Sequence, residues 1–115
     1  MNRDEFVARC EILSGPLAQR AVEAEELRRL PEATLADAHA ADLMRVVVPR
    51  SLGGHGLGLD ALAHGTRAMA RGCPASAWTL SFLMLHGWLL SKLPGEARDE
   101  LFAGGVVPLA PAPLA

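Results

Sequence analysis

Apolar and polar positions alternate with the period of a helix along most of the chain. In the first segment, four apolar residues share one helical face: Phe6, Val7, Cys10 and Leu13. Ser14-Gly15 is expected to end this helix. Narrower stripes, rich in Ala, follow Pro16 and Pro31, with charged residues on the opposite faces. These stripes predict two further helices, and their small side chains allow the helices to pack closely.

The helical period stops at Val46–Val48, where three β-branched residues favour a short extended segment that Pro49 ends. The loop that follows contains four glycines: Gly53, Gly54, Gly56 and Gly58. Its backbone is therefore free to turn tightly or to approach a ligand. Helical spacing returns over residues 59–71.

Residues 75–92 are apolar on nearly every face of a helix, a pattern typical of a central helix surrounded by others. A membrane span is the alternative interpretation of this run. However, the run is shorter than the roughly 20 residues that a bilayer requires, and it contains His86. We therefore expect a buried helix and no membrane partner.

A short amphipathic helix is expected over residues 94–103, ended by Gly104-Gly105. Four prolines stand where predicted helices begin, a position at which the missing N–H costs nothing: Pro16, Pro31, Pro74 and Pro94. Together these patterns predict an all-α domain of five or six helices over residues 1–103. The proline-rich segment 104–115 fits neither helix nor strand, so we expect a linker.

Composition narrows the choice of partners and of cell compartment. Half of the residues are hydrophobic, which favours a folded domain, and the net charge is −2. The basic residues are scattered, so nothing indicates nucleic acid or an anionic membrane as a partner. Cys10 and Cys73 are expected to be free thiols, and "MNRDEF" contains no apolar signal segment. We therefore expect a cytoplasmic protein.

Motifs of fixed spacing are missing from the sequence. The glycine loop does not fit G-x-G-x-x-G, because His55 and Leu59 stand where glycine is required. The histidines and cysteines lack metal-ligand spacing, so no metal site is expected. Ser76 and Ser81 lack the G-x-S-x-G context of a nucleophile. The loop is therefore interpreted as a structural turn rather than a phosphate-binding loop.

His86 is the candidate for chemistry because its neighbours in sequence are so apolar. Such surroundings favour the neutral imidazole, which can act as a base toward a substrate hydroxyl. The alternative is a core histidine bonded to a backbone carbonyl, and the residue taken alone favours this alternative. Trp78 lies eight residues earlier, about 12 Å along a helix and about 80° around it. Both side chains are expected to face one elongated cavity.

Three stretches carry a resemblance: "PEATL…ADLMRVVVPRSLGGHGLGL", "AMARGCPASAWTLSFLMLHGW" and "LPGEARDELFA". They resemble the N-terminal helical domain of the acyl-CoA dehydrogenase fold, from about residue 21 to residue 103. "CPASAW", with a histidine eight residues beyond the tryptophan, is similar to the flavin-dependent monooxygenase branch. That branch includes the oxygenase components of two-component aromatic hydroxylases of the 4-hydroxyphenylacetate type. Acyl-CoA dehydrogenases usually have a small aliphatic residue where Trp78 stands.

The resemblance implies roles for both residues. Trp78 would shape the pocket of a reduced flavin, FMN or FAD. His86 would take the proton of a phenolic substrate, which raises electron density at the ortho carbon where oxygen is added. A flavin reductase would be the partner in a two-component system, and the full-length protein would be a homotetramer.

The resemblance also implies that this chain is a fragment. Family members continue into a β-domain and a C-terminal helical bundle, so residues 104–115 are expected to lead toward a missing β-domain. Activity is then expected only in a complete protein. Two alternatives stay open: an acyl-CoA dehydrogenase, and a non-catalytic helical interaction module.

Overall fold

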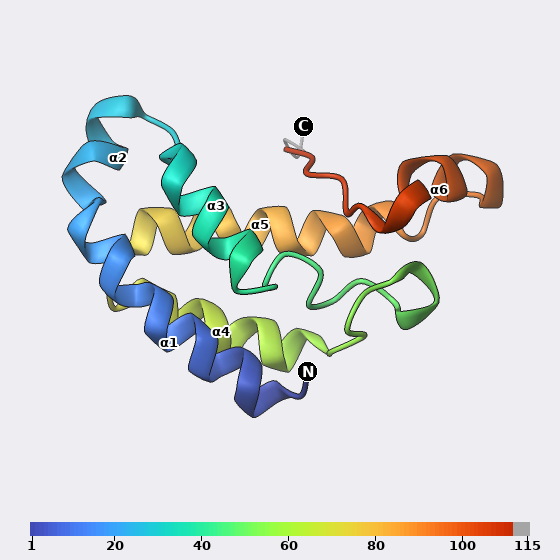
Figure 1. Cartoon of the computed structure of the whole chain (residues 1–115), viewed down its shortest axis with the longest axis horizontal. Helices are drawn as coiled ribbons and strands as arrows, with labels where there is room; N and C mark the ends of the chain where they lie inside the picture. The colour runs from blue at the N-terminus through green and yellow to red at the C-terminus, as the bar shows by residue number, and fades with distance from the viewer. Residues whose placement is uncertain (112–115) are drawn as a thin grey trace.

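The structure is a computed structural model that describes residues 1–111. Six α-helices follow one another: α1 (Arg3–Gln19), α2 (Ala21–Leu27), α3 (Glu32–Ala40), α4 (Leu59–Ala70), α5 (Pro74–Leu90) and α6 (Gly95–Leu101). Short 3-10 turns lie at Arg50–Leu52 and Ala103–Gly105, and residues 1–111 contain no strand. The predicted all-α fold of five or six helices is confirmed. Figure 1 shows α5 along the longest axis, with α4 beside it.

Helix α1 begins at a capping box. The Asn2 side chain accepts a hydrogen bond from the Glu5 N–H, and the Glu5 carboxylate accepts one from the Asn2 N–H, both at 2.9 Å. These two bonds satisfy N–H groups that the first turn of a helix leaves without partners. The acidic side chains of the first turn also face the positive end of the helix dipole.

The predicted end of the first helix at Ser14-Gly15 is wrong, because α1 continues through Pro16 to Gln19. Leu13 and Leu17 lie one helical turn apart and are both buried, so a continuous helix covers both side chains. Pro16 deprives the Ile12 carbonyl of its helical N–H partner. Ile12 is 76% exposed, so the turn that lacks this hydrogen bond lies at the surface of the domain.

Helix α1 ends instead at Gln19, with Arg20 as its C-cap. Two arginines, Arg9 in α1 and Arg20 at its C-cap, connect this helix to α3. The Arg20 guanidinium lies 2.7 Å from the Asp37 carboxylate, and Arg9 donates to the Ala41 carbonyl at 3.0 Å. Pro31, Pro74 and Pro94 stand at helix N-termini as predicted. Helices α1 and α3 are therefore joined by polar contacts at two points.

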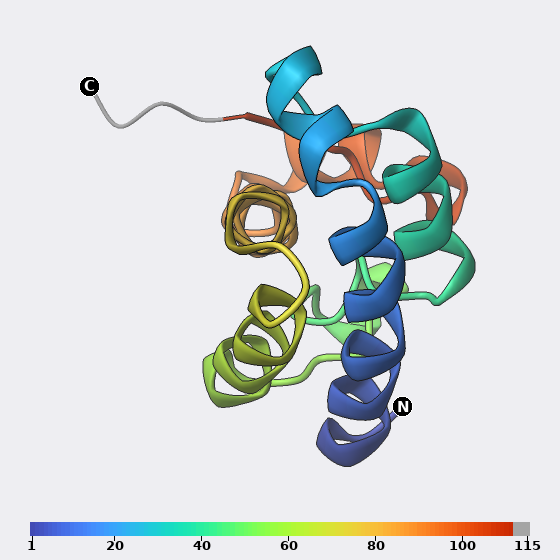
Figure 2. The same ribbon diagram turned by 90° about the vertical axis from the view of Figure 1, so that its left-hand side faces the viewer.

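The core forms where α4 packs against α1 on one side and against α5 on the other (Figure 2). Its largest fully buried side chains come from most of the chain: Phe6, Leu17, Leu43, Met69, Leu80 and Met84. Gly65 allows the close approach of α1, since a Cβ there would lie 2.3 Å from a ring carbon of Phe6. The same Cβ would lie 2.9 Å from the Cys10 sulfur.

Val46–Val48 does not form the expected extended segment; these residues lie in consecutive turns and are buried. The backbone of this segment pairs with the glycine loop instead of with a second strand. Leu57 and Gly56 donate to the carbonyls of Val46 and Val48, both at 2.9 Å. Burial of the three side chains against the helices, rather than sheet formation, explains their hydrophobic character.

The apolar sequence of α5 had predicted a helix surrounded on every side, and this prediction is wrong. Its buried face holds Leu80 and Met84, but Trp78 is 66% exposed and Leu89 is 45% exposed. No helix within residues 1–111 is long and apolar enough to cross a membrane. The exposed side chains form an apolar surface along this face of α5.

Beyond α6 the chain returns over the C-terminal half of α5 (Figure 1). A Cβ on Gly87 would lie 3.3 Å from a methyl carbon of Val107 and 3.1 Å from one of Val48. We call residues 106–111 the return segment. The remaining residues of the predicted linker, 112–115, lie outside the described residues.

Two mid-helix glycines provide a matched test of this packing. Gly65→Ala is expected to lower the free energy of unfolding by about 1–3 kcal/mol, because the new methyl group must displace Phe6. Gly15→Ala, in α1, meets nothing within 4 Å apart from its chain neighbours; the helix propensity that it gains is offset by crowding against the Pro16 ring, so stability is expected to change by less than about 1 kcal/mol. Urea unfolding of both variants measures the difference. Equal effects of the two substitutions would contradict close α1–α4 packing.

Candidate functional site

Helix α5 places three aromatic side chains on one face, each four residues from the next. The rings of Trp78 and Phe82 have centroids 4.8 Å apart, and those of Phe82 and His86 lie 5.7 Å apart, edge to face. The structure therefore brings Trp78 and His86 into one row, joined by Phe82 rather than in direct contact. Sequence reasoning missed Phe82, although its spacing of four residues from both neighbours was the signal. We call these three residues the aromatic row.

The two ends of the aromatic row lie in opposite environments. Trp78 is 66% exposed, whereas His86 is only 6% exposed. An exposed indole on an apolar helix face is suited to packing against a flat group supplied from outside the domain. A buried imidazole is suited to a fixed orientation. Neither residue lines the hollow beside Phe82 between α4 and α5, so a shared cavity remains a prediction.

The Nδ1 atom of His86 is hydrogen-bonded to the backbone carbonyl of Ala110, in the return segment. This contact agrees with the second interpretation of His86 from the sequence, a core histidine bonded to a backbone carbonyl. It uses only one ring nitrogen, however, and Nε2 has no hydrogen bond to any residue within 1–111. The structural contact and a role for Nε2 as a base are therefore compatible.

A hollow of about 320 Å³ lies between α4 and α5, beside the aromatic row. Its lining is mostly apolar: Leu59, Leu62, Ala63, Thr66, Ser81, Phe82 and Leu85. The two hydroxyl groups are both used by helix backbone, since Thr66 donates to the Leu62 carbonyl and Ser81 to that of Trp78, each at 2.7 Å. The hollow therefore presents hydrocarbon and the Phe82 ring to whatever fills it.

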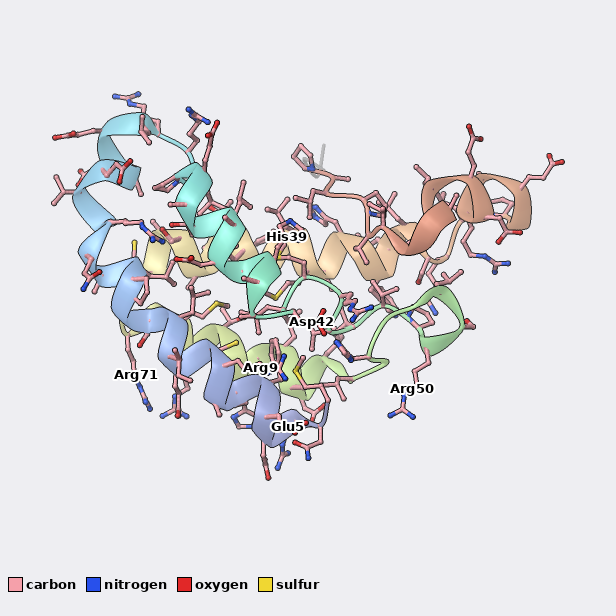
Figure 3. All side chains as sticks on the ribbon, in the orientation of Figure 1. Glu5, Arg9, His39, Asp42, Arg50 and Arg71 are labelled. Atoms are coloured by element: carbon pink, nitrogen blue, oxygen red, sulfur yellow. The ribbon has the colours of Figure 1, made fainter. Side chains whose placement is uncertain are left out.

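A polar cluster of Asp42, Arg45 and His55 holds the glycine loop, and we call this cluster the loop clamp. Asp42 follows α3 (Figure 3), and its carboxylate accepts from the Arg45 guanidinium at 2.6 and 3.1 Å. The other partner is His55, whose Nε2 lies 2.8 Å from Asp42. Arg45 also donates to the Gly53 carbonyl at 2.9 Å. The clamp thus joins the end of α3 to both sides of the loop and supports the predicted structural turn.

The hydrogen bond from Arg45 lowers the pKa of the Asp42 carboxyl below its ordinary value of 3.8, with a smaller contribution from His55. The same pair raises the pKa of Arg45. Asp42 has a left-handed backbone, with φ of 59°. Neither Asp42 nor Arg45 was predicted from the sequence as a site residue.

The remaining candidate groups are the two cysteines and the side chains that could bind a metal. Burial raises the pKa of the Cys10 thiol to about 12, with a further contribution from Glu11, so the thiolate is scarce at neutral pH. Cys10 and Cys73 are both free and buried, as expected. In the described part of the chain, no three His, Cys, Asp or Glu side chains gather as a metal site would require.

The fold defines an all-helical domain with one apolar helix face left open beside an aromatic row. Residues 8–100 match the family described as "Acyl-CoA dehydrogenase, N-terminal domain". The chain therefore belongs to this family, as the resemblance had indicated. No solved structure matches the chain.

Curated relatives extend the comparison. The chain is 30% identical to a pigment production hydroxylase of Rhodococcus sp. over 103 residues. The matched region covers 90% of this chain and 27% of that protein. It is 30% identical to the oxygenase component of an FADH(2)-dependent resorcinol hydroxylase of Rhizobium sp., over 68% of this chain and 19% of that protein.

A third relative is the oxygenase component of p-hydroxyphenylacetate 3-hydroxylase of Acinetobacter baumannii. The identity is 28%, over 75% of this chain and 20% of that protein. The chain thus spans between 19 and 27% of the length of these three relatives.

The loop clamp makes a testable contribution to stability. Asp42→Asn keeps the side-chain shape and tolerates the left-handed backbone, so it isolates the charge. The expected loss is about 1 kcal/mol, since hydrogen bonds between charged groups are strong but this pair is partly exposed. Because the folded-state pKa of Asp42 is lowered, its contribution is full above pH 3.8 and disappears as pH falls through the lowered value.

Chemical unfolding at pH 7 and at successively lower pH measures the difference between parent and variant. Asp99→Asn provides the control, because Asp99 pairs with Arg98 on the surface at 3.4 Å and is 68% exposed. It is expected to change stability by less than about 0.5 kcal/mol. A loss for Asp42→Asn that persists unchanged to acid pH would contradict the clamp.

Proposed function

We propose that the chain is the N-terminal domain of a flavin-dependent monooxygenase that hydroxylates an aromatic, phenolic substrate. The observation that carries the proposal is the aromatic row, in which an exposed Trp78 and a buried His86 stand eight residues apart on one helix. Family membership and the relatives support it, because those named above are hydroxylases or their oxygenase components. Acyl-CoA dehydrogenation is the less favoured enzymatic alternative.

The described residues fit one side of a flavin site. The Trp78 indole and the hydrocarbon lining beside Phe82 offer a flat, apolar surface of the kind against which an aromatic ring system packs. A bound reduced flavin would supply the activation of oxygen. Either FMN or FAD is compatible with this surface, and FADH2 is the form named for one relative. We assign Trp78 to this surface as a cofactor-binding residue.

We assign His86 as the base of the reaction. Proton transfer from the phenolic oxygen to Nε2 leaves a phenolate, which is more electron-rich at its ortho carbon, and an imidazolium. His86 is only 6% exposed, and Phe82 packs against its ring, which limits the contact of this residue with water. Exclusion of water favours transfer of oxygen to substrate over its loss as hydrogen peroxide.

The rest of the enzyme is supplied by chain that this sequence does not include. We place the helical domain at residues 1–103 and the linker from residue 104, leading to a β-domain. A flavin reductase and assembly as a homotetramer belong to the same proposal. A non-catalytic interaction module is the remaining alternative, and retention of flavin by a longer chain distinguishes it from an enzyme.

His86→Ala in the complete protein is expected to lower the hydroxylation rate by about 10²- to 10⁴-fold, the usual cost of removing a general base. Flavin binding is expected to change little, and more of the oxygen consumed is expected to leave as hydrogen peroxide. Single-turnover assays that measure product and peroxide together test this. His64→Ala, at an exposed histidine of α4, is the control and is expected to leave both yields unchanged. An unaltered product yield after His86→Ala would sink the assignment.

The 115-residue chain alone is expected not to retain flavin and to self-associate. Trp78 and Leu59 are 66% and 57% exposed, and such apolar surface promotes association. One face also cannot enclose an isoalloxazine ring, because small-molecule sites bury most of their ligand. Equilibrium dialysis against oxidised and reduced FMN and FAD, with sedimentation velocity, measures both properties. Micromolar binding of flavin by a monomer would show that the site needs no further domain.

A further inference from the structure

The hydrogen bond between His86 and Ala110 constrains the position of a proton. A backbone carbonyl oxygen can only accept, so the Nδ1 atom that faces Ala110 must donate. A neutral imidazole carries one N–H, and with that N–H on Nδ1 the Nε2 atom keeps its lone pair. The contact therefore selects one of the two neutral tautomers.

The sequence around Ala110 favours this carbonyl in its role as acceptor. Pro108 and Pro111 remove two N–H groups from the return segment, so the segment has fewer donors with which to form a helix or pair as a strand. A residue before proline is also restricted to extended backbone, and Ala110 precedes Pro111. The carbonyl is thus held on a stiff segment.

The surface of α5 is shaped to receive the return segment next to His86. Gly87 has no side chain, and a Cβ there would lie within 3.3 Å of Val107. Val48, from the segment that the loop clamp holds, packs at the same point. The return segment therefore meets α5 at Gly87 and at His86, two adjacent positions. Neither contact is explained by the packing of α5 against α4.

We propose that Ala110 is a positioning residue: its backbone carbonyl fixes His86 as the Nδ1–H tautomer and so makes Nε2 the nitrogen that takes the substrate proton. This inference rests on the proposed role of His86 as a base. When Nε2 accepts the proton from the phenolic oxygen, Nδ1 keeps its own proton and its bond to Ala110. The imidazolium that forms is then stabilised by a hydrogen bond that is already in place. The segment that leaves the helical domain thus completes the base.

The tautomer is measured by ¹⁵N NMR of the His86 ring in the 115-residue chain at a pH where the ring is neutral. The expected spectrum shows a protonated Nδ1 and an unprotonated Nε2. A scalar coupling between Nδ1 and the ¹³C carbonyl of Ala110 is expected across the hydrogen bond. If the chain self-associates, magic-angle spinning reports the same ring shifts. A protonated Nε2 without the coupling would overturn the proposal.

Two shortened chains separate the return segment from the rest of the fold. A chain ending at residue 108 loses Ala110, whereas a control chain ending at residue 111 keeps it; both retain Val107 beside Gly87. The control is expected to keep the Nδ1–H tautomer. The shorter chain is expected to shift toward Nε2–H, the form that free histidine prefers in water. Persistence of Nδ1–H in the shorter chain would contradict positioning by Ala110.

Substitution of the ring provides the third measurement. His86→Asn retains an N–H donor near the position of Nδ1, whereas His86→Ala retains none. Nuclear Overhauser contacts between residue 86 and Ala110 are expected to survive in the first variant and to disappear in the second. Loss of these contacts in both variants would mean that the donor does not hold the segment.

These readouts require neither flavin nor turnover, so they are independent of the proposed function. A correct tautomer with normal hydroxylation by His86→Ala would reject the function and keep the contact. An incorrect tautomer with a large loss of hydroxylation would reject positioning by Ala110 and keep the base.

Discussion

The close approach of α1 and α4 at Gly65 is the constraint on which the remaining structure depends. Because this position has no side chain, the Phe6 ring and the Cys10 sulfur pack directly against the α4 backbone. Helix α4 is thereby fixed on one side and supports α5 on the other. Gly72 applies the same principle at the turn into α5, where a Cβ would lie 2.0 Å from the Ser14 carbonyl oxygen. The orientation of the apolar helix follows from glycines in its neighbours.

Once α5 is held in this way, its two faces have different uses. Leu80 and Met84 complete the core, while the aromatic row runs from the open surface at Trp78 to the covered position of His86. The proposed chemistry needs one exposed aromatic residue and one buried base. In that proposal the open indole meets a group from outside, and the covered imidazole keeps the orientation set by its hydrogen bond to Ala110. Phe82 links the two and also lines the hollow against α4.

Local sequence patterns predicted the helices well and their boundaries less well. Periodicity and the prolines at 31, 74 and 94 located the later helices, because those signals act within one or two turns. The helix end predicted before Pro16 was wrong, because burial of Leu13 and Leu17 on a single face outweighs a missing hydrogen bond at an exposed turn. The extended segment predicted at Val46–Val48 was also wrong, because buried turns and buried strands both accommodate β-branched residues.

The candidate site shows the same division between local and distant information. Trp78 and His86 were predicted from their spacing within one helix, and Phe82 could have been. The loop clamp joins residues 13 positions apart and the His86–Ala110 contact joins residues 24 apart, so no helical or strand period predicts them. Both act on the same end of α5, since Val48 and Val107 meet at Gly87. The surroundings of His86 are thus assembled by three segments distant in sequence. The orientation of a histidine whose local sequence favours a purely structural role is thus set by tertiary contacts.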